Sequence, residues 1–487
     1  MQQRRPDVVL LYPSTGIDMP GTSVFAPLSV LLPAAALKRA GLAAEVIDMR
    51  VQRDWRRRLR NAARRRPSML GISAMTGAQI RHGLQAARIW RREAPDAAIV
   101  WGGVHATLLP EQTLEHPLVD AVVAGVGEEA IVELARDLAA GRGEAALGRI
   151  HCLEPEGSGV RDERGVPELD WEAHDWRSWV TPVVGEHRGL ALVTSRGCPH
   201  RCGYCYNRSV NGSRWQGEPA GAVLEDLERI AALGERGVIL FDDNFFVSRR
   251  RVEAIARGLV DRGLRLAIKA DCRADYLARY DDDFLELLAR AGFSLLYVGA
   301  ESGSDRMLEA MRKDATVEQL LEANRKLARV GIRPHYSFMG GLPGERTEDV
   351  RATIELMLRL KRENPRAYLS PIKGYVPYAG TDMFDEACSE GFEPPRELEG
   401  WRRFDWSSGE QPWLEREERR FVEKATYISA GIDTAIAEIA GIGSRGLLGL
   451  GYRRWARLCR RRCERPDLGS VPELPLVRLF RKLATSA

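Results

Sequence analysis

Three cysteines stand close together near the middle of the chain. Cys198, Cys202 and Cys205 form a C-x3-C-x2-C pattern within the stretch SRGCPHRCGYC. A [4Fe-4S] cluster normally takes one cysteine thiolate per iron, so three thiols without a near fourth leave one iron open to an exchangeable ligand. The spacing therefore predicts that these three residues are metal ligands of a catalytic iron–sulfur cluster.

Three other uses of the thiols stay open at this point. A zinc site would take His200 as its fourth ligand, although this residue lies inside the loop and has little freedom to complete a tetrahedron. A disulfide with one odd thiol needs an oxidising compartment, and the start of the chain has no signal-sequence pattern. A cluster that only carries electrons would want a fourth cysteine nearby, and the next one is Cys272.

The elements around the cysteines alternate between strand and helix patterns. Apolar runs of strand type are predicted at residues 189–194, 238–241, 266–270, 295–299, 335–338 and 368–371. Six strand–helix units predict a (βα)6 partial TIM barrel. In such barrels the chemistry lies at the carboxyl ends of the strands, which is where the cysteine loop falls.

Polar residues and glycines follow most of these strands. The candidate binding residues at these positions are Asp242, Asp243, Arg273, Glu301, Gly340, Gly341 and Pro343. Each has a simpler use as well: the aspartates can cap the following helix, the arginine can form a surface ion pair, and the glycines can serve as turns. Their shared position at the barrel mouth favours one ligand that is held from several sides.

The first part of the chain shows the same alternation. Strands are predicted at residues 7–12, 44–48, 69–73, 98–101 and 121–124, which indicates an α/β domain with a doubly wound, flavodoxin-like parallel sheet. Ligands bind such sheets beyond the carboxyl ends of the strands. The candidate residues at those ends are Ser73, Met75, Gly102, Gly103, His105, Gly125, Gly127 and Glu128. Most are small, so a ligand can approach the backbone, although glycines also make ordinary turns.

Length and composition indicate a globular chain of several domains. The 487 residues are 44% hydrophobic and 29% charged, with a formal net charge of +4. We predict a first domain at 1–145, a linker at 146–188, the partial barrel at 189–385 and a small, mostly helical substrate or capping region at 386–487. No nucleic-acid partner is expected from so small a charge, and no apolar run reaches the roughly 20 residues of a transmembrane segment. A cytoplasmic location is expected.

The cysteine spacing, with Tyr204 just before the last cysteine, resembles the radical S-adenosylmethionine (SAM) superfamily. The resemblance implies that SAM chelates the open iron, and that an electron from the cluster cleaves SAM to a 5′-deoxyadenosyl radical. It also implies contacts to SAM. The amino group would meet Asp242 and Asp243, the carboxylate or ribose would meet Arg273 and Glu301, and the adenine would lie among Gly340, Gly341, Pro343 and the backbone of Tyr204.

The first domain resembles the cobalamin-binding domain that precedes the barrel in many radical SAM enzymes. Ser73-Ala74-Met75 and Gly102-Gly103 correspond to the Ser-x-Leu and Gly-Gly of that domain. The Asp-x-His-x-x-Gly signature that supplies a cobalt-ligating histidine is absent, and the first histidine of the chain is His82. Cobalamin is therefore expected without a lower ligand from that motif, with His105 as the spare candidate.

The stretches ESGSD from Glu301 and GGLPGE from Gly340 resemble in particular the branch of magnesium-protoporphyrin ester cyclase and cobalamin-dependent methyltransferases. This implies transfer of a methyl group to an unactivated carbon of a small-molecule or natural-product intermediate, through a 5′-deoxyadenosyl radical and methylcobalamin. Radical cyclisation, dehydration or rearrangement without methyl transfer is the alternative. The expected partner is an external one-electron reductant of flavodoxin or ferredoxin type.

Two further classes of function can be compared with this one. A tRNA methylthiotransferase would have a similar barrel, but it needs cysteines for a second cluster in its first domain, and the first cysteine of this chain is Cys152. A zinc-stabilised binding module would be colourless and would keep its fold in air.

Overall fold

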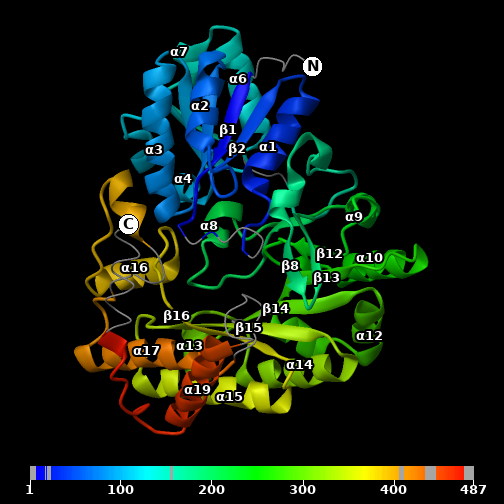
Figure 1. Cartoon of the computed structure of the whole chain (residues 1–487), viewed down its shortest axis with the longest axis vertical. Helices are drawn as coiled ribbons and strands as arrows, with labels where there is room; N and C mark the ends of the chain where they lie inside the picture. The colour runs from blue at the N-terminus through cyan, green and yellow to red at the C-terminus, as the bar shows by residue number, and fades with distance from the viewer. Residues whose placement is uncertain are drawn as a thin grey trace.

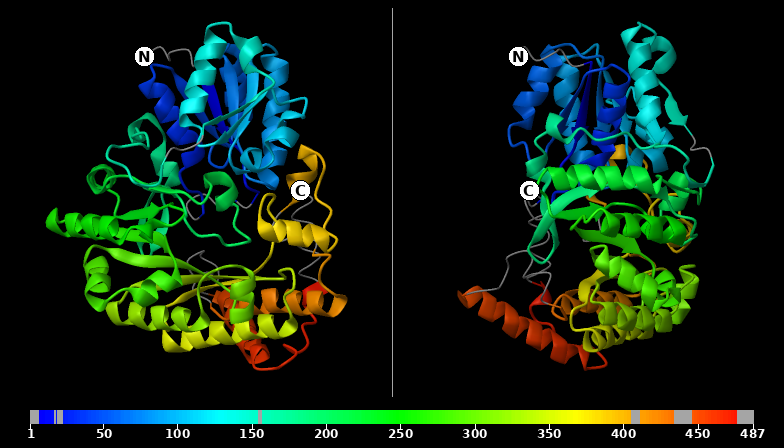
Figure 2. Two further views of the ribbon diagram at one scale, coloured as in Figure 1. Left: turned by 180° about the vertical axis from the view of Figure 1, so that it is seen from behind. Right: turned by 90° about the vertical axis from the view of Figure 1, so that its right-hand side faces the viewer.

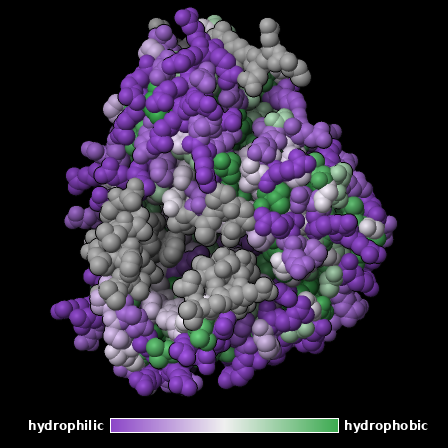
Figure 3. Space-filling model, in the orientation of Figure 1, coloured by the Kyte–Doolittle hydropathy of each residue, from purple (hydrophilic) through white to green (hydrophobic). Residues whose placement is uncertain are grey.

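A computed structural model describes residues 7–16, 18, 23–153, 157–404, 411–433 and 446–475. Two α/β units lie one above the other, and helices near the C-terminus flank the second unit (Figures 1 and 2). The face seen in Figure 3 is mostly hydrophilic, with apolar residues scattered over it. None of the described helices combines the length and the apolar character that a bilayer crossing requires.

The first unit is built on a six-stranded parallel sheet in the order β2-β1-β3-β4-β5-β6. Its strands are β1 (Val8–Tyr12), β2 (Ala44–Asp48), β3 (Met69–Ser73), β4 (Ala98–Gly102), β5 (Ala121–Gly125) and β6 (Ile150–Leu153). Helices α1 (Leu28–Arg39) and α6 (Glu128–Ala139) cover one face, and α2 (Trp55–Arg64) and α3 (Ala78–Glu93) cover the other. The predicted doubly wound sheet is confirmed.

Alternation along β1 explains why helices pack on both faces. Val8 and Leu10 pack with α1 and α6, whereas Val9 and Leu11 pack with α2 and α3. Because both faces are apolar, the strand reads as a continuous hydrophobic run. The order β2-β1-β3 means that the chain reverses direction across the sheet between β1 and β3, which is where sheets of this kind bind ligands.

Strand β6 lies in the segment that sequence analysis assigned to the linker. It pairs in parallel with β5, from Val122 opposite Ile150 to Gly125 opposite Leu153. The sequence pattern did not indicate it because the strand has only four residues and begins shortly after the short helix α7 (Gly143–Ala146). Short strands β7 (Gly159–Val160), β10 (Ser195–Gly197) and β11 (Trp215–Gly217) then form a small separate sheet.

The second unit is a seven-stranded sheet in the order β16-β15-β14-β13-β12-β9-β8. Its six parallel strands are β9 (His187–Leu192), β12 (Gly237–Leu240), β13 (Ala267–Cys272), β14 (Phe293–Glu301), β15 (Arg333–Gly340) and β16 (Tyr368–Gly374). They neighbour each other in chain order, as the predicted partial barrel requires. Strand β8 (Thr181–Val184) runs antiparallel to β9 at the edge.

Helices cover the outer face of this sheet (Figure 1). The longer ones are α9 (Ala220–Ala232), α10 (Arg249–Asp261), α12 (Asp282–Arg290), α14 (Val317–Val330) and α15 (Thr347–Glu363). Shorter segments at the barrel mouth are α8 (Asn207–Asn211), α11 (Ala274–Arg279) and α13 (Asp305–Ala310). Every second strand residue, such as Ile268 and Ala270 of β13, is buried against these helices.

The C-terminal region is mostly helical and contacts both units. Its elements are α16 (Asp382–Ser389), the 3-10 helix η4 (Leu398–Arg403), α17 (Arg416–Ser429) and α19 (Gly446–Cys463). Trp401 of η4 is buried in the core of the first unit, and its indole Nε1 donates to Gln112 Oε1 at 2.6 Å. This part of the chain therefore links the end of the barrel back to the first sheet.

Candidate active site

The cysteine loop leaves strand β10, which begins three residues after β9 ends. Gly197, directly before Cys198, has φ +83°, and a Cβ at this position would lie 2.1 Å from the Arg214 carbonyl oxygen. Only glycine fits here without moving the backbone. The far side of the loop is tied down because Gly203 N donates to Met311 O at 2.8 Å and accepts at its carbonyl from Met383 N at 3.0 Å.

Two aspartates at the end of β12 hold the start of this loop. Asp242 is fully buried and accepts hydrogen bonds of 2.6 Å from Thr194 N, Thr194 Oγ1 and Ser195 Oγ. Asp243 accepts from Gly197 N at 2.7 Å. The carboxylate of Asp242, which the resemblance assigned to the SAM amino group, is thus occupied in positioning the loop.

The three thiols are half-buried and have hydrogen-bond donors beside them. Asn244 Nδ2 lies 3.7 Å from Cys198 Sγ, and Arg273 Nη1 lies 3.6 Å from Cys202 Sγ. Burial raises the pKa of Cys198, and it raises the pKa of Cys205 to about 12. Iron must therefore displace protons from neutral thiols, which couples cluster assembly to pH.

The donor set suits a cubane better than a single ion. No group of three or more His, Cys, Asp or Glu side chains that would hold one metal ion occurs among the described residues. In a cubane each cysteine binds a different iron, so the sulfurs stand apart. His200, which the zinc alternative requires, has Nε2 at 2.7 Å from the Tyr276 hydroxyl. The three thiols and their two donors therefore fit a [4Fe-4S] cluster, and no zinc site forms around His200 in the described part of the chain.

Glu301, Tyr204 and Lys313 form a buried polar group beside the thiols. Glu301 Oε1 lies 3.1 Å from both the Tyr204 hydroxyl and Lys313 Nζ, and Lys313 Nζ lies 2.9 Å from the Tyr204 hydroxyl. Burial and the Glu301 carboxylate raise the pKa of Tyr204, so its hydroxyl stays protonated. Glu301 has φ +63°, a strained backbone for a residue with a side chain. This strain fits a position that is fixed for function.

The glycines after β15 form a tight, covered turn. Gly341 has φ +78°, and its N–H donates to the buried Glu345 carboxylate. Trp413 Nε1 donates to Gly341 O at 2.9 Å, so the C-terminal region lies against this turn. Burial raises the pKa of Glu345 to about 8. Gly340 and Pro343 are buried in the same turn, at the mouth end of β15.

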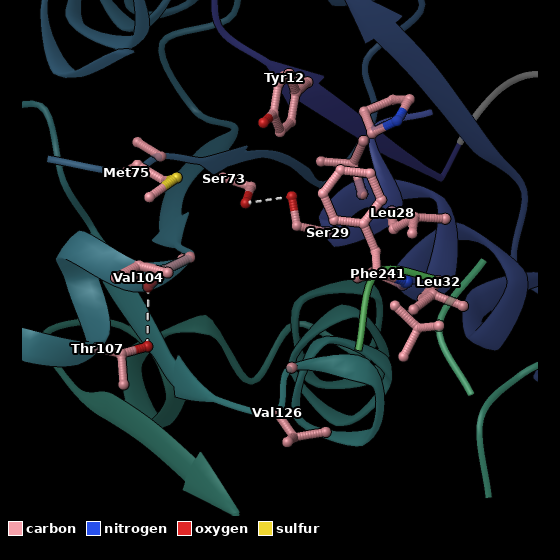
Figure 4. Close-up of a pocket in the computed structure, with 18 of the residues that line it drawn as sticks. Tyr12, Leu28, Ser29, Leu32, Ser73, Met75, Val104, Thr107, Val126 and Phe241 are labelled. Atoms are coloured by element: carbon pink, nitrogen blue, oxygen red, sulfur yellow. Dashed lines mark hydrogen bonds between the residues drawn. The ribbon is translucent and has the colours of Figure 1, made fainter. Parts of the chain in front are cut away.

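A cavity of about 800 Å³ lies between the two units. From the first unit it is lined by most of the residues predicted there: Ser73, Met75, Gly102, Gly103, Gly125, Gly127 and Glu128. Figure 4 shows Tyr12 and Met75 at its edge and the Ser73 hydroxyl bonded to that of Ser29, at 2.9 Å. The second unit contributes residues next to the cysteines, among them Arg196, Tyr206 and Asp243.

The backbone at this edge fits a large cofactor that approaches the strand ends closely. Gly103 has φ +89°, and a Cβ there would lie 2.8 Å from both Ala74 N and Ala74 O. Gly125 has φ +72° and keeps its side open, with only Cys152 Sγ at 4.0 Å from a Cβ. Since the cavity lies at the β1/β3 reversal and is lined by glycines, the residues present suit cobalamin.

An ion pair joins the two walls of the cavity. Arg196, two residues before Cys198, pairs with Glu128 at the start of α6, with Nη1 3.1 Å from Oε2. The chain thus connects the first residue of a helix in the first unit to the cysteine loop itself.

His105 does not line this cavity, although its neighbour Val104 does. Its side chain is buried, with Nδ1 at 3.0 Å from Thr76 Oγ1 and its ring 5.8 Å from that of Trp401. Burial lowers the pKa of His105 to about 4. The residue is not among those that line the cavity, so the structure gives no support to its role as a cobalt ligand.

Sequence reasoning missed four residues that the structure brings to the site. Lys313 reaches the site from a turn, and Tyr206 directly follows Cys205. Asn244 lies beside Cys198, and Thr194 donates to Asp242. Asn244 directly follows Asp243, so its place after a predicted strand was a usable signal. Lys313 lies in the turn after α13, and no local pattern distinguishes it from a surface lysine.

Two family models match the chain. The model described as the radical SAM superfamily matches residues 192–357, and the B12 binding domain matches residues 22–135. The first match contains the cysteine loop and the second contains the glycine-lined strand ends.

Several curated proteins are similar to the chain. An uncharacterised methyltransferase of Pyrococcus horikoshii is 28% identical over 66% of this chain and 70% of its own length. The anaerobic magnesium-protoporphyrin IX monomethyl ester cyclase of Rubrivivax gelatinosus is 26% identical over 66% of this chain and 58% of its own length. Tryptophan 2-C-methyltransferase of Streptomyces laurentii is 25% identical, over 69% and 68%.

Solved structures share the fold over nearly the whole chain. The radical SAM methyltransferase TsrM of Kitasatospora setae, with cobalamin and a [4Fe-4S] cluster bound, has a TM-score of 0.69 at 20% identity and covers 94% of this chain and 99% of its own. The cobalamin-dependent SAM radical enzyme OxsB, with aqua-cobalamin and SAM bound, has a TM-score of 0.68 at 16% identity, over 99% and 76%. At such identities the likeness concerns the fold.

Proposed function

We propose that this chain, which is a radical SAM enzyme with a B12-binding domain, transfers a methyl group to an unactivated carbon of a small molecule. The observation that carries the proposal is the shared cavity. Residues beside the cysteine loop and the glycine-lined strand ends of the first unit face the same space. Cobalamin in this cavity would therefore lie next to the cluster. Methyltransferases among the similar proteins support the same assignment.

The cofactors supply the reactive species when bound: the cluster and SAM a 5′-deoxyadenosyl radical, and cobalamin a transferable methyl group. The protein positions them. Cys198, Cys202 and Cys205 would hold the cluster, and Asn244 and Arg273 donate towards two of the sulfurs. The buried group of Tyr204, Glu301 and Lys313 gives SAM a polar wall whose charges are already paired. An external one-electron reductant of flavodoxin or ferredoxin type would feed the cluster.

The test needs no substrate. The full chain, reconstituted anaerobically with iron, sulfide and cobalamin, is incubated with SAM that carries a deuterated methyl group and with titanium(III) citrate. A methyltransferase forms S-adenosylhomocysteine and moves the deuterated label to cobalamin, both of which mass spectrometry detects. If 5′-deoxyadenosine forms without any S-adenosylhomocysteine, methyl transfer is wrong.

That second outcome would support the alternative, a radical cyclase or rearrangement enzyme. The similarity to the magnesium-protoporphyrin ester cyclases favours this alternative. The shared cavity is compatible with both functions, because each of them would need cobalamin beside the cluster.

A further inference from the structure

The inner face of the second sheet carries charged and hydroxyl side chains that the proposed chemistry does not use. On the outer face, Ile268, Leu296 and Tyr336 are buried against the helices. Since successive strand residues point to opposite faces, the residues between them point inward. We call these residues the inner-face set: Lys269, Asp271, Tyr297, His335, Ser370 and Lys373.

Strand register places the middle of the inner-face set in one row. Asp271 of β13 is opposite Tyr297 of β14, and Tyr297 is opposite His335 of β15. The Tyr297 and His335 rings are 4.9 Å apart, and His335 Nε2 lies 2.9 Å from Ser370 Oγ of β16. Four neighbouring strands therefore bring these side chains into contact across the sheet.

Two lysines flank this row. Lys269 lies two residues before Asp271 on the same strand, and its Nζ is 5.6 Å from the centre of the Tyr297 ring. Lys373 is opposite Met339 near the mouth end of the sheet. Within the described ranges, neither ammonium group has a hydrogen bond or an ion pair within 4.0 Å.

The titration of the neighbouring groups agrees with this placement. Burial lowers the pKa of Lys269 and of Lys373. The pKa of His335 falls to about 3, first because of burial and then because of the charges of Lys269 and Lys373. Both ammonium groups are thus near one neutral imidazole. Burial also raises the pKa of Asp271 to about 7, so this carboxyl group only partly balances the two positive charges.

Lys269 is half-buried, and an unpaired ammonium group in such a place is costly unless something binds it. Lys373, nearer the mouth end of the sheet, is exposed. Charged groups that lose water are normally paired or hydrogen-bonded. Charge-assisted hydrogen bonds from lysine to a carboxylate or a phosphate are among the stronger polar contacts in proteins. The face also offers two rings and a serine hydroxyl, which suit a flat molecule with polar substituents.

We propose that the inner face binds the substrate through an oxyanion, a carboxylate or a phosphate, that Lys269 and Lys373 hold beside Tyr297 and His335. The inference rests on the proposed function in that the bound molecule is the substrate of the barrel. Glu301, at the mouth end of β14 beside Tyr204 of the cysteine loop, is four residues from Tyr297, which corresponds to roughly 13 Å along the strand. A small molecule anchored at the lysines would therefore extend towards the cluster.

Three bromine-labelled probes test the charge requirement. The anaerobic protein, with cluster and cobalamin bound, is titrated calorimetrically with 4-bromobenzoate, 4-bromophenyl phosphate and the neutral 4-bromobenzamide. We expect at least one anion to bind about tenfold more tightly than the amide, and its identity separates carboxylate from phosphate. In soaked crystals the bromine anomalous peak should lie over Tyr297 or His335. Equal binding of the amide, or a peak elsewhere, would overturn the proposal.

Variants identify the cation. Lys269→Met should weaken the preferred anion about tenfold, and Lys269→Arg should retain most of the affinity. The exposed Lys38→Met, which removes a charge from the first unit, should change nothing. Circular dichroism and iron content show whether each variant is folded and loaded.

A competition separates this site from that of SAM. If saturating SAM displaces the anion, the lysines serve the SAM carboxylate and the proposal is wrong. If anion and SAM bind together, the proposal is supported. None of these measurements depends on methyl transfer, so a failure of the proposed function and a failure of this inference give different results.

Discussion

The two sheets present different surfaces at the ends where ligands bind. The first sheet offers mainly backbone and small side chains, such as Gly102, Gly103 and Ser73. After its strands the second sheet offers buried carboxylates that already have hydrogen-bond or ion-pair partners, such as Asp242 and Glu301. A large preformed cofactor needs space and close backbone approach, whereas radical chemistry needs groups fixed in position. The difference indicates that the first unit holds a cofactor and the second unit carries out the reaction.

If this division is correct, a substitution at one surface should leave cofactor binding at the other unchanged. The largest loss of activity should follow the loss of a cluster ligand. Changing Cys198, Cys202 or Cys205 singly to alanine should remove the iron and abolish SAM cleavage, because a cluster with two protein ligands is not retained. Cobalt content should stay near that of the parent. Cys388→Ala, on α16, is the matched control and should keep both metals. Iron analysis and a SAM-cleavage assay give the answer, and an active Cys202→Ala would refute the cluster assignment.

The converse change fills the cavity. Ser73→Phe places a ring where the Ser73 hydroxyl now meets Ser29 (Figure 4). We expect cobalamin content after reconstitution to fall about tenfold or more because the space is lost, while the iron content is unchanged. Ser389→Phe, at an exposed site, serves as control. Loss of iron together with cobalamin would show that the two surfaces are not independent.

A smaller effect should appear in the pH dependence of stability, through Glu345 in the turn after β15 of the second sheet. The pKa of Glu345 is raised from 4.5 to about 8, so the folded chain holds its proton more tightly than the unfolded chain. The contribution of Glu345 to stability is therefore complete below about pH 4.5 and is lost as the pH rises through 8. Relative to Glu345→Gln, the parent should lose roughly 2–4 kcal/mol of unfolding free energy between pH 5 and 8. Urea unfolding at both pH values measures this, and a constant difference would contradict it.

The smallest predicted effect concerns the donors beside the cysteines. Asn244→Asp keeps the side-chain oxygen that accepts from Phe246 N but replaces the amide beside Cys198 with a negative charge. The cluster should become harder to reduce, on the order of 50 mV. Redox titration followed by electron paramagnetic resonance measures the shift. A shift towards easier reduction would mean that Asn244 does not act on the cluster.

Much of the fold was predictable because most of the strands are recognisable in the sequence as short apolar runs. Five strands of the first sheet and all six parallel strands of the barrel coincide with apolar runs, as at 44–48 and 69–73. Strand β6 was missed because four residues carry too little periodicity. The region predicted to be mostly helical, 386–487, contains α17 (Arg416–Ser429), and its residues 405–410, 434–445 and 476–487 lie outside the described part of the chain.

The site was predictable in its positions and less so in its contacts. The cysteine spacing and the glycines at strand ends mark their locations because local geometry demands those residue types. The partners depend on which strands become neighbours. The bonds from Asp242 to Thr194, and from Glu301 to Lys313, therefore appear only in the folded chain. The inner-face set has the same origin, since it joins one or two residues from each of four strands.

The central claim is that cobalamin and the cluster occupy adjoining places across one cavity. Electron paramagnetic resonance of the full chain, reduced to hold cob(II)alamin and the reduced cluster together, tests this directly. We predict that the two signals broaden and relax faster than in samples that hold only one of the two centres, because nearby spins couple. Two unperturbed signals from a protein shown to contain both centres would contradict the account.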